Sequence, residues 1–143
     1  MSSDPPVIGK TAETPQQLVQ RWYETEGSND SPCIPRDWPD EFWSILVSMY
    51  PDMQFWVSHQ SYAPEAVIRS LASADDWRVR HRVAMKRNLP KDLFTVLAAD
   101  PEPLVRMSVA RNAKTPLAVL TQLADDPSGD VVRVASYSLE KRL

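Results

Sequence analysis

The stretch "LPKDLFTVLAADPEPLVRMSVARNAKT", residues 89–115, contains the pattern that decides the fold. Pro90 stands at the first position of a predicted helix, where the missing N–H of proline leaves no intrahelical hydrogen bond unmade. The apolar residues that follow share one helical face: Leu93, Phe94 and Leu97. We expect this helix to end before Pro101, because proline clashes with the preceding turn.

A second, shorter helix is predicted after Pro103. Its inward side carries Val105 and Val109, and it ends near Arg111 and Asn112. Neither helix can bury its apolar face alone. The pair therefore needs neighbours of the same kind, and at least three such units are normally required.

The same unit recurs with a period of 26 residues over residues 38–143. Three series advance with it: Pro64, Pro90 and Pro116; Ile45, Leu71, Leu97 and Leu123; and Val57, Val83 and Val109. This period predicts an all-α solenoid of stacked helix pairs. The repeats are expected at residues 38–63, 64–89, 90–115 and 116–143.

The two end copies depart from the pattern. The first is degenerate, and its helices are expected at residues 39–50 and 52–59. In the last, Arg133 is displaced by one position from the place that corresponds to Arg106, which leaves the register near Val131 and Val132 open. Terminal repeats are commonly atypical because one of their faces meets water.

Three segments carry a resemblance to known repeats: "DDWRVRHRVA" from Asp75, "DPEPLVRMSVA" from Asp100 and "DDPSGDVVRVA" from Asp125. They resemble the bacterial HEAT-like and leucine-rich-repeat-variant families, whose units pair a Pro-led helix with a D-P-x-x-x-V-R-x-x-V-A helix. The resemblance implies a right-handed α-α superhelix of about four repeats. It is nearly silent about function, because such scaffolds carry many unrelated partners.

One protein type within the leucine-rich-repeat-variant family carries an iron–sulfur cluster on a cysteine-rich head. Cys33 is the single cysteine of this chain, so one subunit cannot supply four thiolates to a cluster. We expect no cofactor.

Residues 1–13 are polar and proline-rich and predict a flexible tail. Residues 14–37 predict a capping helix and a loop. Thr14 is the expected N-cap, and the helix runs to about Glu24, carrying Leu18, Trp22 and Tyr23. The loop "GSNDSPCIPRDW", residues 27–38, is interrupted by prolines. Such loops often bind ligands, but the favoured interpretation is that it connects the capping helix to the first repeat.

Composition agrees with one globular domain of 143 residues, 43% hydrophobic and 24% charged. No apolar run approaches the roughly 20 residues that a membrane span requires, and the first residues lack the apolar core of a signal peptide. With one cysteine, no internal disulfide can form, which is consistent with a reducing compartment. These observations predict a cytoplasmic protein with no membrane contact.

The net charge of -3 hides an asymmetry. The N-terminal part is acidic, whereas the middle repeats are locally basic through Arg78, Arg80, Arg82, Lys86, Arg87, Lys91, Arg111 and Lys114. A basic surface favours an acidic partner or nucleic acid. The alternative is structural, because Asp75, Asp100 and Asp126 recur beside Arg80 and Arg106 and could form an Asp–Arg ladder along the turns.

The outward side of the second helices is the candidate binding site. With Val79 and Val83 inward, a rotation of 100° per residue places Arg78, His81 and Met85 outward. In HEAT-like solenoids this face lines the concave groove. Continued through the repeats, it predicts these partner-binding residues: Phe55, His59, Arg78, His81, Met85, Leu104, Met107, Arg111, Arg133 and Tyr137.

This mixture of aromatic residues, methionine and arginine is typical of protein interfaces. The alternative is that Phe55 and Tyr137 are buried against the caps. Trp22, Trp38, Trp43 and Trp56 lie in the N-terminal third, where cap packing is the favoured use, whereas Trp77 is expected to be partly exposed.

Catalytic and metal signatures are not found in the sequence. His59 and His81 have no carboxylate at a helical metal-ligand spacing, and no HExxH pattern occurs. No serine lies in a G-x-S-x-G elbow, and Cys33 has no histidine near it in sequence. We therefore expect no enzyme activity and no bound metal.

Three functions remain open. The favoured one is a non-catalytic protein-binding module, similar to bacterial immunity proteins that block a toxin domain by surface complementarity. The second is nucleic-acid binding through the basic middle repeats, similar to DNA glycosylases built from HEAT-like repeats. The third is an adaptor or scaffold subunit of a larger complex.

Overall fold

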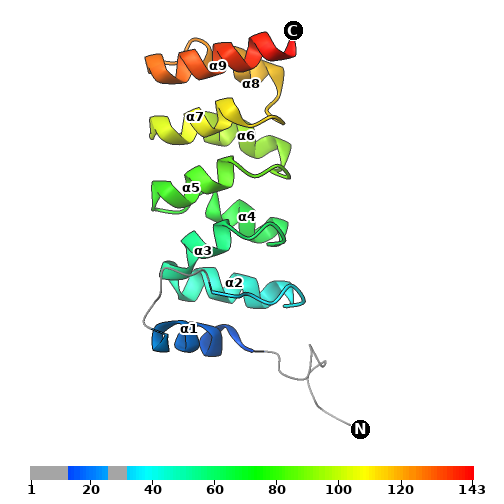
Figure 1. Cartoon of the computed structure of the whole chain (residues 1–143), viewed down its shortest axis with the longest axis vertical. Coiled ribbons are helices and arrows are strands. Elements are labelled where there is room, and N and C mark those ends of the chain that lie inside the picture. The colour runs from blue at the N-terminus through cyan, green and yellow to red at the C-terminus, as the bar shows by residue number, and fades with distance from the viewer. Residues whose placement is uncertain (1–12, 26–31) are drawn as a thin grey trace. The chain divides into compact units, whose positions relative to one another are not determined.

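The computed structural model describes residues 13–25 and 32–143. Within them the chain forms nine α-helices, one 3₁₀ helix and no strand, which confirms the all-α class (Figure 1). Residues 1–12 of the predicted tail and residues 27–31 of the predicted loop lie outside the described residues. In chain order the helices are α1 (Pro15–Glu24), α2 (Asp40–Met49), the 3₁₀ helix η1 (Pro51–Met53), α3 (Gln54–Ser58), α4 (Glu65–Leu71), α5 (Trp77–Ala84), α6 (Lys91–Ala98), α7 (Pro103–Arg111), α8 (Leu117–Leu123) and α9 (Gly129–Arg142).

The chain divides into two compact units, residues 1–67 and residues 68–143, with the boundary inside α4. Each unit has its own buried apolar residues. Leu18, Trp43 and Met53 are enclosed in the first unit, and Phe94 and Leu120 in the second.

In the first unit, α1 begins where the sequence predicts. The Thr14 hydroxyl accepts from the N–H of Gln17, and the Gln17 side chain accepts from the N–H of Thr14, forming a capping box. Leu18 is buried and α1 packs against α2, whereas Tyr23 is 53% exposed and donates to Asp52 at 2.7 Å.

The predicted tail and loop are both anchored where the structure describes them. Glu13, assigned to the flexible tail, forms an ion pair with Arg21 at 2.8 Å, and its carbonyl accepts from Nε1 of Trp38, also at 2.8 Å. Ile34 of the loop is buried, and its carbonyl accepts from the hydroxyl of Tyr62. Glu13 is therefore held by Arg21 and Trp38, and Ile34 packs within the first unit. The connecting role of the loop stays a prediction.

The predicted register of the first copy is wrong by one residue in its first helix. Ile45, assigned to the core, is 42% exposed, and Leu46 is fully buried instead. Val57, in the second helix of that copy, is buried as predicted. The inward positions of the two helices are therefore one residue closer in sequence than in later copies. The predicted second helix over 52–59 is replaced by the 3₁₀ helix η1 followed by α3.

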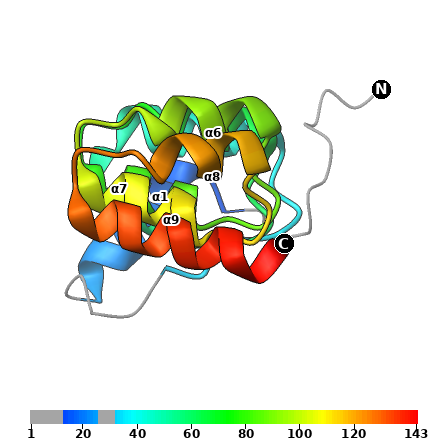
Figure 2. The same cartoon turned by 90° about the horizontal axis from the view of Figure 1, so that it is seen from above.

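The second unit has two layers of helices. Helices α5, α7 and α9 pack side by side, and α6 packs against α8. Figure 2 shows α6 and α8 on one side, with α7 and α9 on the other. The apolar residues predicted to face inward on both layers are buried, among them Leu97, Val105 and Val109.

The helix boundaries keep the period of the sequence. Helices α4, α6 and α8 begin 26 residues apart, and so do α5, α7 and α9. Pro90 and Pro116 are N-cap residues and not the first helical residues predicted, because their extended backbone precedes the first helical turn. Val131 is buried in the place that corresponds to Val105, which settles the register of α9.

Candidate functional site

The predicted outward side of α5, α7 and α9 is exposed in the second unit, and we call it the second-helix face. Three of its apolar residues are open to solvent: Met85 is 48% exposed, Leu104 42% and Tyr137 59%. The alternative that Tyr137 is buried against a cap is therefore wrong. The full face consists of Arg78, His81, Met85, Leu104, Met107, Arg111, Arg133 and Tyr137, of which His81 and Met107 are half-buried.

Phe55 and His59, the other two predicted site residues, belong to the first unit. Phe55 is half-buried, and the centre of its ring lies 4.5 Å from that of His59 and 5.4 Å from that of Trp56. Trp56 also meets Trp22 edge to face at 6.2 Å. These rings form a partly exposed aromatic group on α1 and α3.

The tryptophan prediction holds for two of four residues. Trp38 and Trp43 are buried and contact each other edge to face, as expected of cap packing. Trp22 and Trp56 are half-buried at the surface. In the second unit, Trp77 is half-buried, and the centre of its ring lies 6.0 Å from that of His81.

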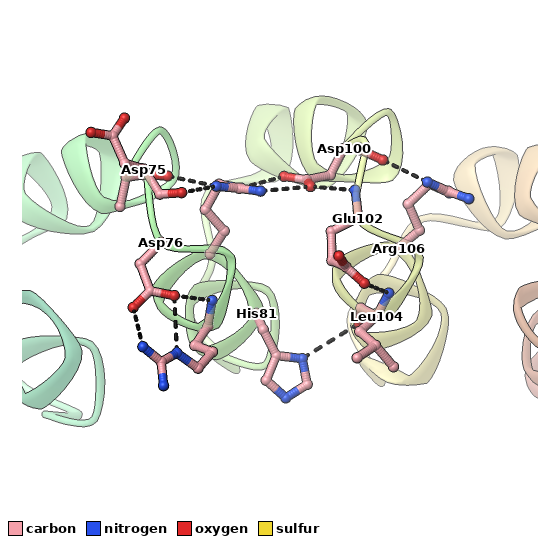
Figure 3. A network of polar contacts seen from close by, with 10 residues as sticks. Asp75, Asp76, His81, Asp100, Glu102, Leu104 and Arg106 are labelled. Atoms are coloured by element: carbon pink, nitrogen blue, oxygen red, sulfur yellow. Dashed lines mark hydrogen bonds and ion pairs between the residues drawn. The ribbon is translucent and has the colours of Figure 1, made fainter.

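Two arginines of the second helices form the ladder that the sequence offered as an alternative. Figure 3 shows the part around Asp100, whose backbone carbonyl accepts a hydrogen bond from Arg106. Arg80 makes a two-point ion pair with Asp100, at 2.7 and 3.2 Å, and Arg106 makes one with Asp126, at 2.8 and 3.0 Å. Asp75 takes part through its backbone alone, because Arg80 donates to its carbonyl and not to its carboxylate. Planar two-point pairs of this kind hold both side chains in a fixed geometry.

The ladder shifts the pKa of Arg80, Arg106 and Asp126. The hydrogen bond to Asp100 raises the pKa of Arg80, and that to Asp126 raises the pKa of Arg106. Burial alone would raise the pKa of Asp126, but donation from Arg106 and from the N–H of Ser128 lowers it overall. Both arginines are thus committed to carboxylates inside the fold.

Other members of the basic set are also engaged or partly buried. Arg78 forms an ion pair with Asp76, at 3.0 Å, which raises the pKa of Arg78. Burial, together with the nearby charge of Arg82, lowers the pKa of Lys86 to about 8. The surface of the middle helices is therefore less basic than the number of their arginines and lysines suggests.

His81 is held between α5 and α7. Its Nδ1 atom lies 2.6 Å from Oγ of Ser108 and 3.4 Å from the carbonyl oxygen of Leu104. Oγ of Ser108 also lies 3.1 Å from the carbonyl oxygen of Leu104, so these three groups form one set of polar contacts. The contacts link α5 to α7.

Sequence reasoning missed the polar links between successive second helices. The amide of Asn112 donates to the carbonyls of Ala84 and Lys86, both at 2.9 Å, and the hydroxyl of Ser138 donates to the carbonyl of Ala110 at 2.7 Å. Asn112 and Ser138 are 26 residues apart, so a search for polar residues with the repeat period would have found them.

A hollow of about 400 Å³ lies on the second-helix face where α7 meets α9. Arg111 from α7 and Arg133 from α9 both line it, together with Val134, Tyr137 and Ser138. The sequence identified three of these residues, and Val134 and Ser138 were missed because hydrophobic periodicity assigns them no special place.

Metal-ligand clusters and membrane-spanning helices are both absent from the described part of the chain. No three histidine, cysteine or acidic side chains lie together there as metal ligands would. In those same residues, no helix has the length and apolar character needed to cross a membrane.

Comparison of the chain with protein families, with curated proteins and with solved structures finds no match.

Proposed function

We propose that the chain is a non-catalytic protein-binding module that recognises its partner through the second-helix face. The observation that carries the proposal is the exposure of Met85, Leu104 and Tyr137 on helices that pack side by side. Exposed apolar side chains that cluster with arginines are typical of interface surfaces.

The scaffold of this module is proposed to be a HEAT-like or leucine-rich-repeat-variant solenoid of about four repeats. Its support is the spacing of 26 residues between successive helix starts in α4 to α9 and the resemblance of the second-helix segments. Such repeats present extended surfaces to partners.

An immunity-type role is the most specific form of this proposal. In it, the second-helix face covers a toxin domain and blocks it by complementarity, without chemistry. An adaptor role in a larger complex would use the same face.

Nucleic-acid binding is less well supported. Arg80 and Arg106 hold Asp100 and Asp126 within the fold and are not free to neutralise phosphates. Non-specific affinity for nucleic acid depends on the number of phosphates that a protein neutralises.

The proposal is tested by capturing the partner from the native host and comparing variants. Tyr137→Ala and Met85→Ala should each weaken the complex at least about fivefold, as expected of exposed anchors that become buried on binding. Val96→Ala is the matched control, because Val96 is 54% exposed on α6, outside the second-helix face.

Isothermal titration with the purified partner gives the affinities, and circular dichroism confirms that each variant is folded. Unchanged affinity in both second-helix variants, or an equal loss in Val96→Ala, would contradict the proposal.

A further inference from the structure

The hollow between α7 and α9 brings together two cationic side chains from different helices. Arg111 lies in the last turn of α7, and Arg133 lies near the start of α9. Both are exposed. Among the described residues, no acidic side chain lines the hollow with them.

The two guanidinium groups are available to a ligand. Arg111 makes no hydrogen bond or ion pair within the described part of the chain, in contrast to the committed Arg80 and Arg106. Arg133 has one partner, Asp130, at 2.6 Å, but both side chains are more than half exposed. Exposed pairs of this kind exchange readily for a better-oriented partner.

Two contacts hold the walls of the hollow. The Ser138 hydroxyl donates to the carbonyl of Ala110, the residue before Arg111, and thereby ties α9 to the end of α7. Tyr137 is oriented by the ammonium group of Lys141, which lies 5.3 Å from the centre of its ring. A preformed site loses less entropy on binding than a flexible one.

The lining matches an anionic ligand with two acceptor oxygens. Arginine forks are complementary to carboxylates, to which they donate two parallel hydrogen bonds. The Tyr137 hydroxyl can donate a further bond, and Val134 offers apolar surface to a short aliphatic stem. A protein partner would supply such an anion as the carboxylate of an aspartate or glutamate side chain.

We infer that the hollow formed by Arg111, Arg133 and Tyr137 binds an aspartate or glutamate side chain of the protein partner. This inference rests on the proposed function and names the chemistry that the second-helix face recognises.

The hollow is tested without the partner, by NMR titration with acetyl-Glu-Glu-Glu-amide and with acetyl-Gln-Gln-Gln-amide as its uncharged counterpart. The acidic peptide should shift the side-chain Nε–H signals of Arg111 and Arg133 saturably. Arg111→Gln should weaken that binding at least about tenfold, because it removes a charge-assisted pair. Lys91→Gln, an exposed change on α6, is the matched control and should have no effect.

Equal shifts with the glutamine peptide, or equal weakening in Lys91→Gln, would overturn the inference. Tighter binding of a short oligothymidylate than of the acidic peptide would also overturn it, in favour of nucleic-acid phosphate. With the captured partner, unchanged affinity in Arg111→Gln would overturn the placement of the hollow in the interface. The peptide titration tests the hollow alone, so a failed titration contradicts only this inference. The proposed function is contradicted separately, if Tyr137→Ala and Met85→Ala leave the affinity for the captured partner unchanged.

Discussion

Arg80 and Arg106 occupy equivalent positions in α5 and α7, and each reaches a carboxylate 20 residues further along the chain. The side chains of the pair between Arg106 and Asp126 are only 13% and 5% exposed. Such a pair adds little net stability when intact, but removing one partner leaves a charge without compensation.

We expect Asp126→Ala to lower the free energy of unfolding by about 3 kcal/mol at pH 7, the lower end for breaking a buried pair. The lower end applies because Arg106 keeps its bond to the carbonyl of Asp100. The folded pKa of Asp126 lies below its unfolded value. The stability that the Asp126 carboxylate contributes is thus fully present above its unfolded pKa, and it is lost as the pH falls through its folded pKa.

Urea unfolding at pH 7 and at about pH 3 measures this effect, and the difference between wild type and Asp126→Ala should shrink at the lower pH. Asp92→Ala is the control, because Asp92 pairs with Arg69 while 62% exposed. A loss in Asp126→Ala that does not change with pH would show that the ion pair is not its cause.

At the scale of the element, α6 shows how one helix separates packing from surface. Leu97 is 1% exposed, whereas its neighbour Val96 is 54% exposed. Adjacent helical residues point about 100° apart, so one faces the core and the other faces water.

Leu97→Ala should destabilise the protein by about 2–5 kcal/mol through the cavity that it leaves. Val96→Ala should change stability by no more than about 0.5 kcal/mol. Chemical denaturation of both variants measures the difference. Comparable losses in the two variants would mean that the assigned inward face of α6 is wrong.

At the scale of the whole molecule, the chain divides into two compact units, and each contains buried apolar residues. In repeat proteins, stability is roughly a sum of terms within repeats and between nearest neighbours. A defect in one place therefore need not weaken every helix equally.

Native-state hydrogen exchange should show this difference. In Leu97→Ala, we expect amides of α6 to α9 to lose more protection than those of α1 and α2, because the cavity lies in the second unit. An equal loss of opening free energy throughout the chain would instead show that both units unfold in one cooperative step.

The fold could be predicted closely where local signals act alone. The N-cap at Thr14, the prolines and the spacing of the valines in α7 fix their segments without reference to distant residues. The prediction was wrong at Ile45, where the one-residue shorter connection to Val57 broke the period. A degenerate copy offers too few matching residues for its register to be found by spacing.

The sequence by itself determined the helices of the second unit and the outward side of α5, α7 and α9, because helical periodicity and proline sterics operate within a few residues. Only the tertiary structure decided that Arg80 and Arg106 bind Asp100 and Asp126 inside the fold, while Arg111 meets Arg133 at a hollow. The reason is physical: burial and charge pairing depend on which elements lie side by side, and spacing along one helix does not contain that information.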